Sequence, residues 1–245
     1  MKLFERFDAL IAAGELRSDA EQAAAAKRLA LLQDELESAP PRGSILWRIA
    51  RKRPVSPKGL YLWGDVGRGK SMLMDLFYDS VTIGRKRRAH FHEFMIEIHA
   101  RLRIERDKQK GDPIAPVVTA IAEETRLLCF DEMVVNNMAD AAIMSRLFAG
   151  LIEAGVTLVI TSNRHPDDLY KNGLNRELFL PFITLVKDSL DIVALNGPVD
   201  YRRLRLSGAR TWLSPNGAET TAALSESFFR LTDYPPEDRE HVPAT

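Results

Sequence analysis

Apolar residues in the middle of the chain recur with two periods, one typical of strands and one typical of helices. Short apolar runs predict five strands, over residues 60–63, 89–94, 126–130, 156–161 and 191–195. Stretches with apolar residues three or four positions apart predict helices over residues 70–77, 95–106, 117–124, 139–153 and 174–182. This alternation predicts an α/β fold in which helices cover both faces of a five-stranded parallel sheet.

The first 57 residues have a helical pattern instead. Apolar residues share one helical face up to Gly14, where a first helix is expected to end. Ser18 and Glu21 have the spacing of a capping box, so a second helix is predicted from Ser18 to about Glu37. A short third helix is expected over residues 44–53. We interpret residues 1–57 as a helical extension that packs on the core or on a partner.

The part of the chain after residue 197 is less regular. Residues 201–206 and 209–213 predict a hairpin, and a helix is expected over about 218–231. The predicted organisation is therefore a helical extension, an α/β core, a small α/β segment and a disordered polar tail. Their bounds are 1–57, 58–197, 198–232 and 233–245.

A glycine-rich loop follows the first predicted strand and precedes a predicted helix. It matches the pattern GxxxxGK[ST] and comprises Gly64, Asp65, Val66, Gly67, Arg68, Gly69, Lys70 and Ser71. Such a loop turns its backbone N–H groups toward a polyphosphate, which the dipole of the following helix also attracts. Lys70 is expected to reach the β and γ phosphates, and the Ser71 hydroxyl to coordinate Mg²⁺. The loop therefore predicts binding of a nucleotide such as ATP.

Two carboxylates, Asp131 and Glu132, follow the apolar run at residues 126–130. Because carboxyl ends of parallel strands meet at one edge of a sheet, both are expected near the phosphates. We assign Asp131 to Mg²⁺ through water and Glu132 to polarising the hydrolytic water. On its own, an acidic pair after an apolar strand is common, and the phosphate loop is what favours this interpretation.

Two further residues complete the predicted catalytic set. Asn163, after the fourth strand, can position the water and contact the γ phosphate, although an asparagine can also simply turn the chain. Arg176 is expected to open a helix and to complete the site of a neighbouring subunit, as arginine fingers do. A surface ion pair is the alternative role for Arg176, and Arg164 is the competing finger.

Composition narrows the function classes and the setting. The 245 residues include 34 basic and 34 acidic side chains, so the net charge gives no reason to expect nucleic acid as partner. We interpret the basic runs at residues 51–53 and 85–88 as solvated loops, with nucleic acid or anionic lipid contact as the alternative. The single cysteine, Cys129, and the absence of an apolar run of about 18 residues predict a cytoplasmic protein without an integral membrane segment.

Four motifs together resemble the ZapE family of AAA+-type cell-division ATPases and their mitochondrial relatives, the lactation-elevated ATPases. The motifs span residues 59–71, 90–95, 128–132 and 161–183, and the resemblance covers the chain from about Phe7 to about Leu231. It implies an AAA+-type P-loop ATPase that acts with ATP and Mg²⁺ as an oligomer. For bacterial members it implies an effect on the FtsZ ring, or on another protein client, at the inner face of the membrane at the division site.

Two departures from the family pattern bear on activity. Residues 133–137, Met-Val-Val-Asn-Asn, stand where the family usually has Phe-Gln and then Thr-Asp. The family also continues into an arginine-bearing helical segment that resembles the AAA+ lid, whereas this sequence ends before it. Weak or partner-dependent hydrolysis is therefore expected. The leading hypothesis is an oligomeric Mg²⁺-ATPase that remodels a partner. The alternative is a nucleotide-switched binding module with little hydrolysis, and a small-metabolite kinase is a weaker third.

Overall fold

The computed structural model describes residues 1–38, 56–108, 111–197, 217 and 219–225. The chain divides into two compact units, Met1–Gly197 and Pro198–Thr245. In the second unit, residues 219–225 are helical, and the Thr221 N–H donates to the Gly217 carbonyl at 3.0 Å. The helix expected over 44–53, the expected hairpin and the expected tail lie outside the described residues. The predicted boundaries at residues 57 and 232 remain predictions.

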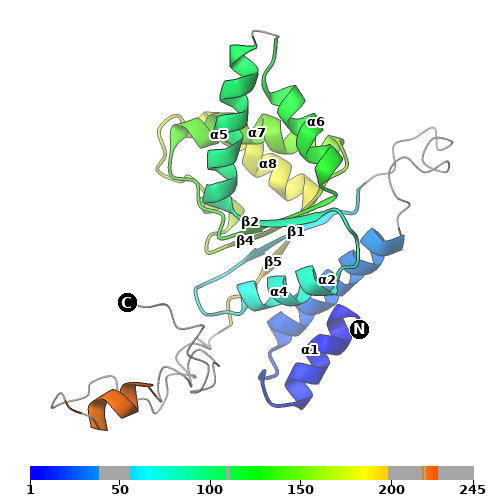
Figure 1. Cartoon of the computed structure of the whole chain (residues 1–245), viewed down its shortest axis with the longest axis vertical. Coiled ribbons are helices and arrows are strands. Elements are labelled where there is room, and N and C mark those ends of the chain that lie inside the picture. The colour runs from blue at the N-terminus through cyan, green and yellow to red at the C-terminus, as the bar shows by residue number, and fades with distance from the viewer. Residues whose placement is uncertain (39–55, 109–110, 198–216, 218, 226–245) are drawn as a thin grey trace. The chain divides into compact units, whose positions relative to one another are not determined.

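The first unit is built on a parallel sheet, which confirms the predicted fold class (Figure 1). Its strand order is β2-β3-β4-β1-β5. The strands are β1 (Gly59–Trp63), β2 (Lys86–His90), β3 (Leu127–Asp131), β4 (Thr157–Ser162) and β5 (Leu190–Ala194). Strand β4 therefore lies between the strand that precedes the glycine-rich loop and the strand that ends in the acidic pair. All carboxyl ends meet at one edge of the sheet.

Four helices cover one face of the sheet (Figure 1). They are α5 (Phe91–Asp107), α6 (Ile114–Glu124), α7 (Met138–Glu153) and α8 (Leu180–Ser189). Their core contains an aromatic chain in which Phe130 contacts Phe94 and Phe148, with ring centroids 4.7 and 5.6 Å apart. Phe148 in turn meets Phe182 at 5.2 Å. Side chains on one face of the strands, such as Tyr61 and Phe130, point into this core.

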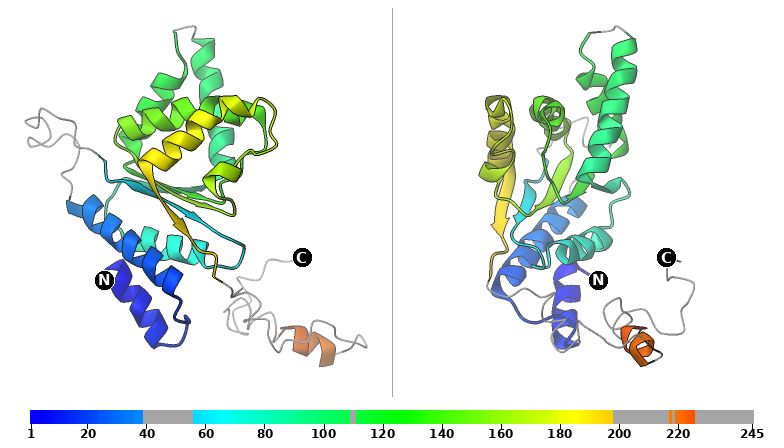
Figure 2. Two further views of the ribbon diagram at one scale, coloured as in Figure 1. Left: turned by 180° about the vertical axis from the view of Figure 1, so that it is seen from behind. Right: turned by 90° about the vertical axis from the view of Figure 1, so that its left-hand side faces the viewer.

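The opposite face is covered by α4 (Lys70–Ser80) and α2 (Ala20–Ser38), with α1 (Leu3–Ala12) outside them (Figure 2). Side chains on the other face of the strands, including Leu62, Cys129 and Val159, point toward these helices. Burial raises the pKa of the Cys129 thiol, which is therefore protonated and inert. Helix α2 contacts both ends of α4, so it reaches from the carboxyl edge of the sheet to the amino edge.

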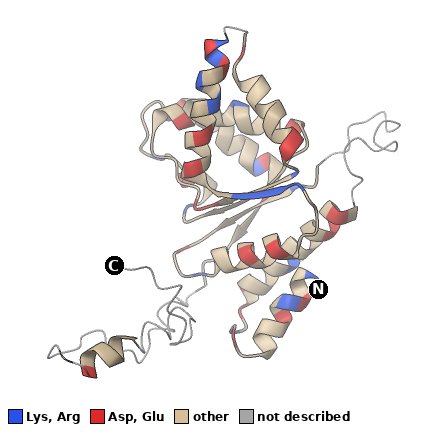
Figure 3. Cartoon of the chain, viewed as in Figure 1, with Lys and Arg blue, Asp and Glu red and all other residues tan. Residues whose placement is uncertain are grey.

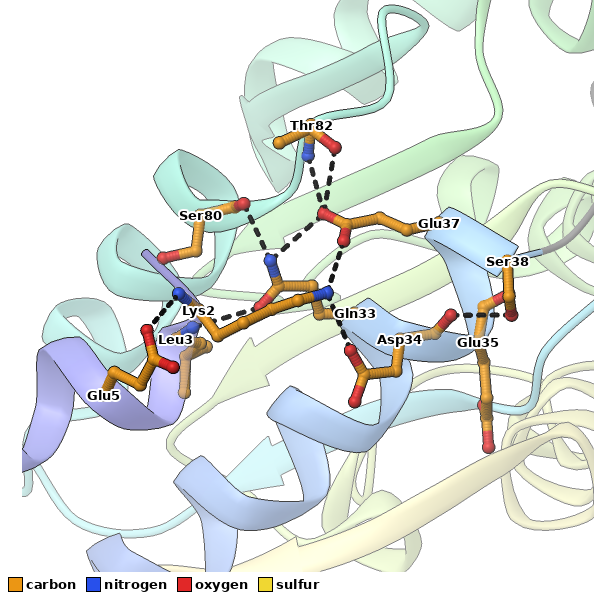
Figure 4. A network of polar contacts seen from close by, with 10 residues as sticks. All are labelled: Lys2, Leu3, Glu5, Gln33, Asp34, Glu35, Glu37, Ser38, Ser80 and Thr82. Carbon is orange, nitrogen blue, oxygen red and sulfur yellow. Dashed lines mark hydrogen bonds and ion pairs between the residues drawn. The ribbon is translucent and has the colours of Figure 1, made fainter.

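A polar network fixes α2 at the amino edge (Figure 4). The Gln33 amide donates to the Ser80 carbonyl at 2.8 Å and accepts from the Leu3 N–H at 3.0 Å. Glu37 accepts from the Thr82 N–H at 3.0 Å and pairs with Lys2 at 2.7 Å. Burial alone would raise the pKa of Glu37, but these hydrogen bonds outweigh it and lower the pKa to about 2. The network ties α1, α2 and the end of α4 together.

The prediction for β2 was wrong in its bounds. The strand covers Lys86–His90, and α5 begins at Phe91, so residues 91–94 are helical and not extended. The basic run was also wrongly interpreted as a solvated loop, because residues 86–88 form this edge strand, blue in Figure 3. These side chains have partners within the chain: Arg87 pairs with Glu97, and the Lys86 ammonium donates to the Val81 carbonyl at 2.8 Å. Charged side chains suit an edge strand, because they disfavour pairing with a further strand.

Helices α2 and α8 begin at residues other than those predicted, each for a physical reason. The helix expected over 174–182 is instead a short 3₁₀ turn, η2 (Arg176–Leu178), followed by α8 from Leu180. Pro181 explains the start of α8, since proline fits the first turn of a helix and disrupts its interior. At α2, Asp19 replaces the expected Ser18 cap, and its carboxylate accepts from the N–H groups of the first turn at 2.8 and 3.0 Å.

Candidate functional site at the carboxyl edge

The glycine-rich loop connects β1 to α4 at the carboxyl edge, and its backbone requires glycine at three positions. Gly67 and Gly69 have φ 82° and 84°, a left-handed conformation that disfavours side chains. At Gly64 a Cβ atom would lie 2.1 Å from the carbonyl oxygen of Leu195, the residue after β5, so there is no space for one. These contacts fix the path of the loop, and α4 begins immediately after it at Lys70.

Lys70 is folded back over the loop from which it arises. Its ammonium donates to the carbonyls of Gly64 and Asp65 at 2.7 and 2.8 Å, and the residue is buried. Ser71 follows in the first turn of α4 and is exposed. The loop therefore has a buried positive charge on one side and the amino end of an 11-residue helix behind it.

Asp131 ends β3 and is held by an arginine that sequence reasoning missed. Arg88 on β2 donates from Nε to Asp131 Oδ2 at 2.6 Å and from Nη2 to Oδ1 at 3.3 Å. It also pairs with Asp75 on α4. Burial alone would lower the pKa of Arg88, but hydrogen bonds to both carboxylates raise it. Arg88 thus connects the metal-directed carboxylate to the helix that follows the loop.

Glu132 lies in a strained turn that β4 holds in place. Its φ of 52° lies in the left-handed region, which residues other than glycine rarely adopt. Residues with such strained backbone cluster at functional sites. The Glu132 N–H donates to Thr161 Oγ1 at 3.0 Å, and the next residue, Met133, donates to the Thr161 carbonyl at 2.8 Å. The Glu132 side chain is exposed. Thr161 therefore sets the backbone from which this carboxylate projects.

Ser162, the last residue of β4, joins the acidic turn to the glycine-rich loop. Its carbonyl accepts from the Gly64 N–H at 3.2 Å, and its hydroxyl donates to the Met133 carbonyl at 2.9 Å. The same hydroxyl accepts from the Arg164 N–H at 3.2 Å. The ends of β1, β3 and β4 are therefore connected directly by hydrogen bonds of one residue.

The remaining predicted residues lie on the segment that follows β4. Asn163 and Arg164 come directly after Ser162 and are both exposed. Arg176 lies farther along in η2, where its Nη2 donates to the Asp167 carbonyl at 2.6 Å. Among the described residues its buried Nε has no hydrogen-bond partner. The structure therefore brings Asn163 to the ends of β1 and β3, while Arg176 contacts its own chain at a separate turn.

Residues 133–137, which depart from the family pattern, stabilise the fold here. Met133 and Val135 are buried in the core that α5, α6, α7 and α8 form with the sheet. Asn137 caps α7, accepting from the Asp140 N–H at 2.8 Å and donating to the Asp140 carboxylate at 2.7 Å. Asp140 also contacts His99 Nε2 at 2.7 Å, across to α5. The segment thus anchors two helices to the end of β3.

The donors at this edge fit Mg²⁺. Within the described ranges, no three His, Cys, Asp or Glu side chains converge as a metal site. Mg²⁺ is usually held by one or two protein oxygens together with substrate phosphates and water, so it needs no such cluster. Ser71 and Asp131 supply a hydroxyl and a carboxylate of this kind. In the same ranges, no helix has an apolar stretch long enough to cross a bilayer.

The sequence of this chain is similar to a known family and to several known proteins. The family model for AFG1-like ATPases matches residues 1–244. The cell division protein ZapE of Escherichia coli is 40% identical over 229 residues, which is 89% of this chain and 60% of that protein. Lactation elevated protein 1 homolog B of Danio rerio is 44% identical over 195 residues, 74% of this chain and 39% of that protein.

Among solved structures, the replication initiator DnaA bound to AMPPCP and single-stranded DNA matches with a TM-score of 0.51 at 13% identity. The match covers 89% of this chain and 62% of that one. At this identity the likeness concerns the fold alone, a parallel sheet covered by helices on both faces. The chain spans 39–60% of the length of the two curated relatives described above. From the family match over residues 1–244, the chain belongs to the AFG1-like ATPase family.

Proposed function

We propose that this chain binds ATP and hydrolyses it with Mg²⁺ at the carboxyl edge of β1, β3 and β4. One observation carries the proposal: Thr161 and Ser162 hydrogen-bond both the glycine-rich loop and the turn of the acidic pair. A phosphate-binding loop and a carboxylate pair are thereby held as one unit. Hydrolysis of a nucleoside triphosphate needs this combination, because positioning and electrostatic stabilisation supply most of the catalysis.

In this proposal the loop binds the phosphates and Lys70 changes partners. In the structure its ammonium donates to the carbonyls of Gly64 and Asp65. A γ phosphate is a stronger acceptor than these carbonyls because it is charged. Lys70 therefore moves to the β and γ phosphates when ATP binds. The dipole of α4 attracts the same negative charge.

Mg²⁺ would be held by Ser71 and, through water, by Asp131, and it would supply charge neutralisation to the phosphates. Arg88 keeps the Asp131 carboxylate at the end of β3 in one orientation, with a hydrogen bond to each oxygen. Each carboxylate oxygen has a second lone pair, which remains available to a metal-bound water. Asp131 can therefore keep its contact with Arg88 and still accept a hydrogen bond from that water.

Glu132 would act as the base that polarises the attacking water. Its side chain is exposed and projects from a turn that Thr161 fixes, and it makes no ion pair within the part of the chain that the structure describes. Asn163 would contact the γ phosphate or the same water, because it follows Ser162 between the loop and the acidic turn. A carboxylate base beside a neutral amide suits water as the nucleophile.

We also propose that the site is shared in a homo-oligomer, with Arg176 completing the site of a neighbour. Its Nη2 donates to the Asp167 carbonyl at 2.6 Å, and its buried Nε makes no hydrogen bond within the described residues. Leu174 and Leu178 on either side of Arg176 are 71% and 53% exposed. Exposed apolar residues around an arginine suit a contact with a second copy.

The client is proposed from the relatives alone. The Escherichia coli relative is named a cell division protein, and by that resemblance we propose that this chain acts on FtsZ, or on another protein client. The proposed place of action is the cytoplasmic face of the membrane at the division site.

Two substitutions test the central proposal by separating binding from hydrolysis. Lys70→Ala should weaken ATP binding at least about tenfold, because a charge-assisted contact to phosphate is lost. Glu132→Gln should bind ATP as the parent does and lose turnover by about 10² or more. Equilibrium titration with ATP and measurement of phosphate release give the two readings.

Glu37→Gln is the matched control, because it makes the same chemical change at the amino edge. It should leave both binding and turnover unchanged. Undiminished turnover in Glu132→Gln would remove Glu132 from the proposed role. Binding without turnover in the parent chain would favour the nucleotide-switched module instead.

A further inference from the structure

A buried glutamine from the N-terminal helices contacts the glycine-rich loop directly. Gln22 lies in the first turn of α2 and is 3% exposed. Its amide nitrogen Nε2 donates to the carbonyl oxygen of Arg68 at 3.0 Å. The contact joins residues 46 positions apart in sequence, so no local pattern could reveal it.

This hydrogen bond fixes the peptide group between Arg68 and Gly69. In a trans peptide the carbonyl and the N–H point in opposite directions. With the Arg68 carbonyl directed at α2, the Gly69 N–H must point away from α2. Backbone N–H groups of this loop are the groups expected to hold phosphate, so the orientation of this peptide decides whether one of them is presented.

The packing around Gly69 supports the same role. A Cβ atom at Gly69 would lie 2.7 Å from Gln22 Nε2, so the glutamine fills the space that a side chain would need. The positive φ of Gly69 places its backbone in the left-handed region. Gln22 therefore packs against a left-handed glycine of the loop and restricts it.

Gln22 is itself held from both sides. The Asp19 carboxylate caps the first turn of α2 and accepts from the Gln22 N–H at 3.0 Å. The neighbouring Glu21 accepts from the Gly197 N–H at 2.8 Å, after β5. Arg68 completes the connection by donating from Nε to the Leu195 carbonyl at 3.2 Å. Hydrogen bonds thus connect the start of α2, the loop and the segment after β5.

We propose that Gln22 is a positioning residue for phosphate binding, which orients the Arg68–Gly69 peptide so that its N–H faces the nucleotide. The proposal rests on the proposed function of the loop and deepens it. It gives the N-terminal helices a part in nucleotide affinity, because they supply the side chain that organises the loop before ligand arrives. A pre-organised loop loses less conformational freedom on binding.

Helix α2 supplies a matched control. Gln33 is 1% exposed, and its amide donates to the Ser80 carbonyl at 2.8 Å, at the other end of α4 (Figure 4). Gln22 and Gln33 therefore share residue type, helix, burial and a backbone carbonyl as partner. They differ in where that carbonyl lies, and Gln33 also accepts from the Leu3 N–H and donates to the Glu37 carboxylate, both at 3.0 Å.

The test compares Gln22→Met with Gln33→Met in the whole chain, since methionine is close in size and cannot donate the hydrogen bond. Equilibrium titration with ATP should show about tenfold weaker binding for Gln22→Met and no change for Gln33→Met, a tenfold loss being typical of one hydrogen bond. Hydrogen exchange without ligand should be faster at residues 64–71 only in Gln22→Met. Circular dichroism establishes that each variant folds.

Unchanged affinity together with unchanged loop exchange in Gln22→Met would overturn the proposal. Equal losses of affinity in both variants would also overturn it, because they would indicate general destabilisation. If Gln22→Met fails to fold, Gln22→Asn withdraws the same amide by one methylene and is tested in the same way. If the parent chain binds no ATP, the proposed function fails, while loop exchange still decides whether Gln22 orders the loop.

Discussion

Helix α2 and strand β4 both reach from the carboxyl edge of the sheet to the amino edge, and each has a matched pair of residues at its ends. On α2, Gln22 holds the glycine-rich loop and Gln33 holds the end of α4. On β4, Thr161 accepts from the Glu132 N–H at 3.0 Å. Thr157 is buried, and within the described residues its hydroxyl has no hydrogen-bond partner.

The difference between the two edges lies in what the hydrogen bonds restrain. At the carboxyl edge they restrain left-handed backbone at Gly69 and Glu132, next to the groups proposed to meet ATP. At the amino edge they join helices to one another, as Gln33 and Glu37 do. Substitutions at the carboxyl edge should therefore change the handling of ATP. Substitutions at the amino edge should change only the free energy of unfolding.

The largest effect is expected at Arg176, the residue proposed to serve a neighbouring subunit. Arg176→Ala should lower turnover by about 10³ or more, as for other arginine fingers, and leave ATP binding unchanged. Phosphate release per subunit from the parent chain should rise with protein concentration, and mixing with Glu132→Gln should restore activity. Flat specific activity over a wide dilution range would exclude a shared site. A comparable loss in Arg164→Ala but not in Arg176→Ala would transfer the role to Arg164.

A smaller effect is expected from the paired threonines of β4. Thr161→Val keeps the shape but leaves the Glu132 N–H without its acceptor, so turnover should fall about tenfold and the unfolding free energy by about 1–3 kcal/mol. Thr157→Val removes a buried hydroxyl that has no partner in the described structure, so stability should rise by up to about 1 kcal/mol with turnover unchanged. Denaturant titration and phosphate release measure both quantities. Equal effects of the two substitutions on turnover would contradict the contrast between the edges.

The smallest effect is expected from Glu37, and it concerns acid stability alone. The pKa of Glu37 is lowered from 4.5 to about 2 in the folded chain, so its ionised form stabilises the fold above about pH 4.5. That stabilisation is lost as the pH falls from about 4.5 to about 2. Glu37→Gln should remove about 1 kcal/mol at neutral pH and flatten the pH dependence in this window. An unaltered acid-unfolding curve in Glu37→Gln would show that the Lys2 and Thr82 contacts contribute nothing.

Sequence periodicity predicted the sheet because buried parallel strands are apolar and short. Strands β1, β3, β4 and β5 lie within one residue of their predicted bounds at every end. It placed β2 wrongly because three of its five residues are charged. The carboxylates that pair with Arg87 and Arg88 are 10 and 43 positions away in sequence. Polar and apolar residues alternate at residues 90–92, and this short pattern fits the first turn of a helix as well as it fits a strand.

The candidate site was predictable where its chemistry is local in sequence. The glycine-rich loop and the Asp131–Glu132 pair each form a recognisable local motif. Gln22, Arg88 and Thr161 carry no such signal, since their importance comes from contacts across 46, 43 and 29 positions. Only the packing of α2 and the order of the strands bring these side chains to the loop and the acidic turn.

The most direct test of the account is hydrogen exchange of the whole chain with and without ATP and Mg²⁺, because it examines both edges in one measurement. The account predicts slower exchange with ATP at residues 64–71 and 131–133, at the carboxyl edge. It predicts unchanged exchange at residues 80–83, where Glu37 contacts Thr82. Exchange that ATP leaves unchanged at the loop, or slows equally at both edges, would contradict the claim that the carboxyl edge is the ATP site.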